Sequence, residues 1–214
     1  MRAYIFDLDG TLLDSMGVWE HIDVDFLSKR GFDVPEDYIN EICSRSFPEA
    51  AKYTIERFNL PDSVEDLLNE WKAMAAYAYG HTVPLKPNAL EYLMALKNRG
   101  AKLAVATSLP AALYEPALLN HGIKDLFDVI CSTDEVAYGK TKADVFILTA
   151  QKLGIPPEMC IVFEDIVQAM QSAKQAGMTV YGVYDQSSED QWELIKKTAD
   201  GVIYDFKDAP IPEL

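Results

Sequence analysis

Carboxylate side chains directly follow two apolar runs of the sequence. Asp7 and Asp9 come after the first run, and Glu164 and Asp165 come after a later run that ends at Phe163. Side chains two residues apart on an extended segment point the same way, and two carboxylates that share a site need a cation to offset their repulsion. Asp165 adds a third oxygen donor, and three hard oxygen ligands suit Mg²⁺, which usually bridges protein carboxylates to a substrate phosphate. These residue types therefore predict a magnesium site that could receive a phosphorylated compound.

Hydroxyl and lysine side chains stand at similar places. Thr107 and Ser108 follow an apolar run that begins at Lys102, and Lys140 precedes a helical pattern that begins at Asp144. Each of these residues, taken alone, could serve a turn or a helix N-cap. Ligands of open α/β sheets bind outside the carboxyl ends of the strands, so the shared placement of these residues favours a single site.

The elements that must position these side chains alternate along the chain. Short apolar runs, each followed by a helical pattern, are typical of a parallel sheet with crossover helices on its faces. Six runs are expected to be strands: Ala3–Phe6, Lys102–Ala106, Asp128–Cys131, Cys160–Phe163, Thr179–Val183 and Val202–Tyr204. We therefore expect an α/β fold with a Rossmann-like, three-layer, parallel-sheet core.

The segment between the first and second strands has a different pattern. From residue 16 to residue 81 no β-branched run occurs, and the apolar residues fall at helical spacing. One stripe is Val18, Ile22 and Phe26, and the last begins at Val64 with Asp62 or Ser63 as its N-cap. This pattern predicts an all-α insertion, the helical cap domain 16–81, within a core domain made of 1–15 and 82–214.

Four short motifs resemble those of the haloacid dehalogenase-like hydrolase superfamily and occur in the same order. FDLDGTLLDS at Phe6–Ser15 is similar to the first motif, and VATS at Val105–Ser108 is similar to the second. GK at Gly139–Lys140 is similar to the third motif, and FED at Phe163–Asp165 to the fourth. Helices directly after the first motif are the arrangement of the subgroup that contains phosphoglycolate-phosphatase-like enzymes and β-phosphoglucomutase.

The resemblance implies roles for the acidic residues. Asp7 would be the nucleophile that attacks phosphorus and forms an aspartyl-phosphate intermediate. Asp9 would act as general acid and then as general base. Mg²⁺ would be held by Asp7, the backbone carbonyl of Asp9, and Asp165. Glu164 would assist the metal indirectly, through water or through the ligands.

The resemblance also implies a phosphate-binding group. Its members would be Gly10, Thr11, Thr107, Ser108 and Lys140. The backbone at Gly10 would approach the phosphate closely, the Thr107 hydroxyl would donate to a phosphoryl oxygen, and Lys140 would offset charge as Asp7 approaches phosphorus. The third motif lacks the family's usual prolines at Thr141 and Ala143, which leaves Lys142 as a rival to Lys140. Arg45, in the helical segment, is a candidate for binding a distal anion of the substrate.

The expected function is hydrolysis of a small-molecule phosphomonoester by a Mg²⁺-dependent phosphatase. A mutase similar to β-phosphoglucomutase is the alternative within the same chemistry, because the same core can return the phosphoryl group to a sugar. A dehalogenase would need no metal, so the intact Asp9 and Asp165 argue against that branch. A catalytically silent binding or regulatory protein is the alternative from another class, and the presence of both Asp7 and Asp165 disfavours it.

Composition limits the partners and the compartment. The formal net charge is −15, which opposes binding to nucleic acid or to an anionic membrane, whereas a local lysine or a divalent metal can still attract a phosphorylated metabolite. The three cysteines are widely spaced, as expected for a reducing cytosol. No signal peptide and no long uncharged apolar stretch is visible, so a cytoplasmic monomer is the default expectation.

Overall fold

The computed structural model describes residues 2–35, 37–43, 45 and 47–211. Two compact units make up the chain: one is Met1–Met16 together with Val83–Leu214, and the other is Gly17–Thr82. Each unit is described below by itself.

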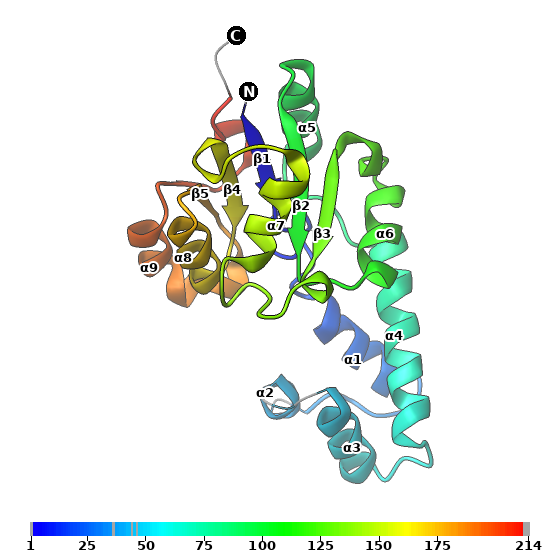
Figure 1. Cartoon of the computed structure of the whole chain (residues 1–214). Coiled ribbons are helices and arrows are strands. Elements are labelled where there is room, and N and C mark those ends of the chain that lie inside the picture. Colours follow the sequence, from blue (N-terminus) through cyan, green and yellow to red (C-terminus); the bar gives the residue numbers. More distant parts are fainter. Residues whose placement is uncertain (1, 36, 44, 46, 212–214) are drawn as a thin grey trace. The chain divides into compact units, whose positions relative to one another are not determined.

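A six-stranded parallel sheet forms the centre of the first unit (Figure 1). Its strands are β1 (Ala3–Phe6), β2 (Lys102–Thr107), β3 (Val129–Ser132), β4 (Cys160–Glu164), β5 (Thr179–Val183) and β6 (Gly201–Ile203). They lie in the order β3-β2-β1-β4-β5-β6, so β1 is central although most of the sheet follows residue 100. The expected α/β fold with a parallel sheet is confirmed, and each expected strand lies within one residue of the observed one at either end.

Helices cover both faces of this sheet, which makes three layers. The longer ones are α5 (Ala89–Asn98), α6 (Ala111–Asn120), α7 (Asp144–Leu153), α8 (Val167–Gln175) and α9 (Trp192–Thr198). Short 3₁₀ turns are η1 (Lys124–Leu126), η2 (Thr133–Glu135), η3 (Pro157–Met159), η4 (Gln186–Gln191) and η5 (Phe206–Asp208). Helix α7 contacts β1, β2 and β3, α8 contacts β4 and β5, and α5 contacts β2.

The strands are continuous apolar runs because both faces of the sheet are buried. On β1, Ala3 and Ile5 point into the core cluster shared with α7, α8 and α9. Tyr4 and Phe6 point to the opposite face, where both rings pack edge-on against Tyr92 of α5. The period-2 alternation of the strand thus supplies both halves of the core.

The second unit is all-helical. Its helices are α1 (Val18–Ser28), α2 (Tyr38–Cys43), α3 (Phe47–Phe58) and α4 (Val64–His81). Phe26 of α1 packs against Trp71 of α4 with the ring centroids 5.8 Å apart. Ser63, rather than Asp62, caps α4 by accepting a hydrogen bond from the backbone N–H of Asp66, while Asp62 pairs with Arg30 at 2.8 Å. The expected helical insertion between the first two strands is confirmed.

Two helices have no counterpart among the expected elements. Helix α6 contains Pro116 and exposes Leu119, and α2 has only six residues. Neither presents a long apolar stripe with one polar face, so the 3.6-residue period is weak in both segments. No helix in the described part of the chain is long and apolar enough to cross a membrane.

The two chain segments that lead out of the sheet unit are tied to each other. The backbone N–H of Asp14 donates to the carbonyl of Pro84 at 2.9 Å, and that of Lys86 donates to Leu12 at 2.8 Å. The Lys86 ammonium pairs with Asp185 at 2.5 Å and with Asp14 at 3.2 Å. These bonds fix the loop after β1, which carries the first motif.

Candidate active site

Three adjacent strands bring the chemistry-bearing residues to one edge of the sheet. Phe6 is paired in register with Val105 of β2 and with Phe163 of β4. The residues that follow these positions therefore meet at the carboxyl edge of the sheet, as expected for an open α/β fold. The backbone N–H of Asp7 donates to the carbonyl of Phe163 at 3.0 Å, which fixes the first-motif loop against β4.

Asp7, Glu164 and Asp165 form a buried acidic cluster. One carboxylate oxygen from each residue lies within 4.8 Å of the others, and none of the three side chains is more than 4% exposed. Burial of a carboxylate disfavours its charged form. Burial raises the pKa of Asp7 to about 7, although Lys140 acts in the opposite direction. Burial, together with the charges of Glu164 and Asp7, raises the pKa of Asp165 well above its usual range.

Lys140 is the cation of this cluster. Its ammonium contacts Oδ1 of Asp7 and lies 2.7 Å from Oε1 of Glu164. Burial alone would lower the pKa of Lys140, but the two carboxylates outweigh that effect and raise it. Lys142 is exposed and its ammonium lies 3.5 Å from the centre of the Tyr138 ring. Of the two lysines, Lys140 is therefore the one that contacts Asp7.

Glu164 organises the loop of the fourth motif. Its Oε2 accepts hydrogen bonds from the backbone N–H groups of Asp165 and Ile166, at 2.7 and 2.9 Å. Its other oxygen contacts Lys140. With both oxygens engaged by the protein, Glu164 orients its neighbours. This arrangement fits the indirect role expected from the sequence.

Asp165 has one oxygen that the described part of the chain leaves unsatisfied. Oδ1 accepts a hydrogen bond from the Thr11 hydroxyl at 3.2 Å, whereas Oδ2 is buried and has no hydrogen-bond partner among the described residues. A buried carboxylate oxygen without a partner is costly unless a cation or donor reaches it. Three clustered carboxylates against one lysine, with an unsatisfied oxygen among them, therefore fit a divalent metal ion.

Gly10 makes room for Asp165. Its φ is +72°, in the left-handed region, and a Cβ atom there would lie 2.3 Å from Oδ2 of Asp165. Both the backbone conformation and the space thus require glycine. The sequence predicted that Gly10 would allow close approach of a phosphate. Among the described protein atoms, those of the Asp165 carboxylate lie closest to this position, and the approach of a phosphate to Gly10 stays a prediction.

Asp9 and Thr107 have local partners at the same edge. The Ser15 hydroxyl donates to Oδ1 of Asp9 at 2.6 Å, so the last residue of the first motif orients that carboxylate. The Thr107 oxygen accepts a hydrogen bond from the backbone N–H of Leu109 at 3.1 Å. This leaves the Thr107 hydroxyl hydrogen without an acceptor among the described residues. Ser108, which follows, is exposed.

Arg45 lies in the helical unit with its own partners. Its guanidinium pairs with Glu41 at 2.9 Å and lies 4.2 Å from the centre of the Tyr53 ring. A role in binding a distal substrate anion therefore remains a prediction.

Sequence reasoning missed the supporting contacts. The Thr11 hydroxyl orients Asp165, a contact that the sequence did not predict, and phosphate binding at Thr11 stays a prediction. The contact of Ser15 with Asp9 was not expected, although a hydroxyl six residues after an acid in a tight loop is a usable signal.

Cys131 and Cys160 are free and buried, and the side chain of Cys43 lies outside the described residues.

Comparison with known proteins places these motifs in a family. Residues 4–183 match the family described as haloacid dehalogenase-like hydrolase. The chain is 29% identical over 181 residues to hexitol phosphatase B of Escherichia coli (strain K12), covering 82% of this chain and 80% of that protein. It is 28% identical over 184 residues to a phosphorylated carbohydrates phosphatase of Thermotoga maritima, with 86% and 85% covered.

A solved structure shares the fold over nearly the whole chain. It is that of a putative beta-phosphoglucomutase from Thermotoga maritima, with a TM-score of 0.82 and 27% sequence identity. The superposition covers 95% of this chain and 94% of that one. The similarity therefore includes both the parallel sheet and the helical insertion.

Proposed function

The chain belongs to the haloacid dehalogenase-like hydrolase family, and we propose that it is a Mg²⁺-dependent phosphatase that hydrolyses the phosphomonoester of a small sugar, polyol or related metabolite. The observation that carries the proposal is the cluster of Asp7, Glu164 and Asp165, with one lysine contact and one unsatisfied carboxylate oxygen. The names of the two relatives, which refer to hexitol and to phosphorylated carbohydrates, support the substrate class.

Asp7, Asp165 and the backbone carbonyl of Asp9 would hold the metal. When bound, Mg²⁺ would supply the positive charge that offsets repulsion between the carboxylates and the phosphate. Glu164 stays outside this set because Lys140 and two backbone N–H groups already engage its oxygens.

Asp7 carries the first chemical step. Its carboxylate attacks phosphorus, so that a new P–O bond to Asp7 forms while the bond to the leaving oxygen breaks. Lys140 keeps this carboxylate charged and oriented through their direct contact. The carboxylic acid form of Asp9 donates its proton to the departing oxygen, and Ser15 holds that side chain in place.

Water completes the second step. Asp9, now ionised, takes a proton from a water molecule whose oxygen bonds to phosphorus, and the bond from Asp7 to phosphorus breaks. Inorganic phosphate leaves and Asp7 is restored as a carboxylate. Thr107 and the backbone around Gly10 and Thr11 supply the nearest uncharged groups for phosphoryl oxygens, with Ser108 at the exposed rim.

The helical segment 16–81 is assigned the role of a cap domain. Opening and closing are expected, because the aspartyl-phosphate must be shielded from water first and exposed to it later. Substrate choice is assigned to this unit, with Arg45 as the candidate for a distal anion.

A mutase remains the second candidate, because the solved structure with 27% identity is named a putative beta-phosphoglucomutase. A purified-enzyme screen separates the two. Release of inorganic phosphate from hexose and hexitol phosphates in the presence of Mg²⁺ is the expected result. Conversion of β-glucose 1-phosphate to glucose 6-phosphate without phosphate release would favour the mutase. Hydrolysis of an aryl phosphate at the wild-type rate by Asp7→Asn would overturn both assignments.

A further inference from the structure

A pocket lies at the edge of the sheet opposite to the acidic cluster. Arg2 directly precedes β1, Ile161 is near the start of β4, and Thr179 begins β5, and all three line this pocket. The strands are parallel, so these positions lie at their amino ends, whereas Asp7 and Asp165 follow the carboxyl ends. The pocket is therefore separate from the catalytic edge by the length of the strands.

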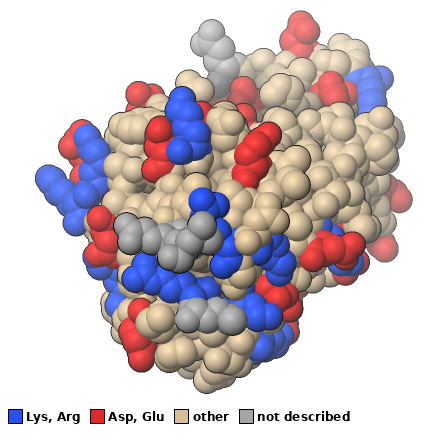
Figure 2. Space-filling model, turned by 90° about the horizontal axis from the view of Figure 1, so that it is seen from above, with Lys and Arg blue, Asp and Glu red and all other residues tan. Residues whose placement is uncertain are grey.

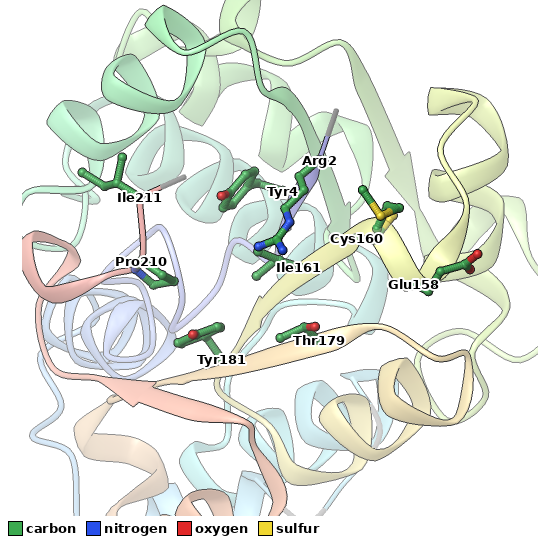
Figure 3. A pocket seen from close by; sticks show the side chains of 10 residues that line it. Arg2, Tyr4, Glu158, Cys160, Ile161, Thr179, Tyr181, Pro210 and Ile211 are labelled. Atoms are coloured by element: carbon green, nitrogen blue, oxygen red, sulfur yellow. The ribbon is translucent and has the colours of Figure 1, made fainter. Parts of the chain in front are cut away.

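The lining combines a cation, hydroxyl groups and apolar walls. Figure 3 shows Arg2, Tyr4 and Tyr181 around one hollow, with the guanidinium toward its middle. Thr179 adds a hydroxyl, and the wall below is Ile161. The pocket has a volume of about 140 Å³, close to that of a cavity that accepts a benzene-sized group.

Arg2 and Arg99 are the two arginines for which the described residues supply no acidic partner, and of these two only Arg2 lines the pocket. Arg30, Arg45 and Arg57 each pair with a carboxylate. Arg2 makes no side-chain hydrogen bond or ion pair with any residue in the described ranges. Its positive charge nevertheless acts on Tyr4 in the pocket lining. Burial raises the pKa of Tyr4, and the charge of the Arg2 guanidinium partly opposes this effect. In a chain of net charge −15, an arginine with no acidic partner is a position where an external anion can bind.

The aromatic part of the lining is held in place by packing. The ring of Tyr181 stacks on Phe163 with the centroids 5.5 Å apart, and a Cβ atom on Gly201 would lie 2.5 Å from a carbon of the Tyr181 ring. Tyr4 is only 1% exposed and packs against Tyr92. The rings of Tyr4 and Tyr181 are thus fixed in the lining, which lowers the entropy lost when a ligand binds.

We propose that this pocket binds a small organic anion, with its carboxylate or phosphate group on the Arg2 guanidinium and a ring-sized apolar body against Ile161 and Tyr181. The guanidinium offers two parallel donors that match two oxygens of such a group. Thr179 adds a hydroxyl to the same lining. The lining residues thus account for both the negative charge and the size of the proposed ligand.

Figure 2 shows charge of both signs on one face of the molecule. Basic side chains (blue) occur among the acidic ones (red) on the face shown there, so the overall negative charge does not exclude positive regions. Glu158 also lines the pocket and opposes an anion, although no ion pair joins it to Arg2. Removal of the Glu158 charge should therefore strengthen binding, while removal of the Arg2 charge should weaken it.

The probe for this site is 4-fluorobenzoate, followed by ¹⁹F NMR. Wild-type protein should bind it saturably with a dissociation constant on the order of 1 mM. Arg2→Met should weaken binding roughly tenfold or more, because one charge-assisted contact is lost. Glu158→Gln should strengthen binding by roughly twofold to fivefold. Arg99→Met is the matched control, since Arg99 makes only a 3.5 Å contact with the carbonyl of Ala95, and it should leave the constant unchanged.

A catalytic variant separates this proposal from the proposed function. Asp7→Asn should bind the probe as wild type does, whatever its effect on turnover. Amide resonances of Ile161 and Thr179 should shift in the titration. Absence of saturable binding up to about 20 mM, or equal affinities for wild type and Arg2→Met, would refute the site. Loss of binding in Asp7→Asn would also refute it, because the probe would then occupy the catalytic edge.

Discussion

A Cβ atom on Gly10 would lie 2.3 Å from Oδ2 of Asp165, the carboxylate oxygen that has no hydrogen-bond partner in the described part of the chain. The loop of the first motif and the loop of the fourth motif therefore approach each other closely at Gly10, beside the hydrogen bond from the Thr11 hydroxyl to Asp165. A cation or hydrogen-bond donor that binds this oxygen must therefore approach it beside Gly10, which has no side chain.

Gly10→Ala tests this contact. The added methyl group strains a backbone with φ of +72° and displaces the Asp165 carboxylate. We expect Mg²⁺-dependent turnover of an aryl phosphate to fall on the order of 100-fold or more, because small displacements of catalytic groups are costly. Gly100→Ala is the matched control: Gly100 has φ of +73° and no atom within 4 Å of the added Cβ.

Both glycine variants should lose about 1 kcal/mol of stability through backbone strain. Only Gly10→Ala should lose turnover per folded molecule. An equal effect of the two variants on turnover would mean that backbone strain, rather than the contact with Asp165, explains the loss.

Lys140→Met should remove most activity. The change leaves the buried carboxylates of Asp7 and Glu164 without their shared cation, and we expect kcat to fall by a factor on the order of 10² to 10⁴. Lys142→Met, in the same loop but over the Tyr138 ring, should keep wild-type kcat. The reverse ranking of the two variants in steady-state assays would assign the catalytic role to Lys142.

Metal binding should be visible without substrate. Mg²⁺ should raise the melting temperature of the wild-type protein, because it binds the folded cluster and not the unfolded chain. Asp165→Asn should abolish this response and should itself raise the melting temperature of the metal-free protein. The reason is that burial raises the pKa of Asp165, so ionisation of this residue at neutral pH costs folding free energy.

Thermal unfolding with and without Mg²⁺, in the presence and absence of EDTA, tests the Mg²⁺ response of the wild-type protein and the effects of Asp165→Asn. A wild-type protein whose melting temperature ignores Mg²⁺, or an Asp165→Asn variant that still responds to it, would contradict the assignment of Asp165 as a ligand.

Asp23 in the helical unit should make stability depend on pH. Burial, with a contribution from Glu20, raises the pKa of Asp23 to about 7, and the carboxylate has no hydrogen bond or ion pair with a described residue. A raised pKa in the folded state means that the folded chain binds more protons than the unfolded chain between about pH 4 and 7. The free energy of unfolding should therefore fall as the pH rises through this window.

Asp23→Asn should remove this dependence. The variant should be more stable than wild type at pH 8 by roughly 1 to 3 kcal/mol, and the two should be equally stable near pH 4. Urea denaturation at both pH values measures the difference. If the difference in free energy of unfolding between the two proteins does not change with pH, ionisation of Asp23 does not destabilise the folded protein.

The sequence predicted the sheet and the acidic residues of the candidate site because both can be recognised from short stretches of the sequence. The strand at Ala3–Phe6 and the helix at Asp144–Leu153 have clear periodicity, and Asp7 and Asp165 follow strands directly. The contacts of Thr11 and Gly10 with Asp165 could not be predicted, since residues about 155 positions apart meet only after β1 and β4 pair. Helix α6 was missed because its apolar residues do not mark one face.

The choice between Lys140 and Lys142 also needed the structure. Both lysines lie in the same short loop, and the spacing from Asp144 and Phe146 favours Lys140 without excluding Lys142. Only the path of the loop decides which ammonium reaches Asp7. The pocket at Arg2 left no signal in the sequence, because its lining comes from the starts of three strands and from the segment near Pro210.

The central claim is that the Asp7 carboxylate becomes phosphorylated during turnover. Borohydride added during steady-state turnover reduces an acyl phosphate to an alcohol, and tandem mass spectrometry locates the reduced residue. Reduction is expected at Asp7, only when substrate and Mg²⁺ are both present. Reduction or phosphorylation of a different residue, with Asp7 unmodified under the same conditions, would contradict it.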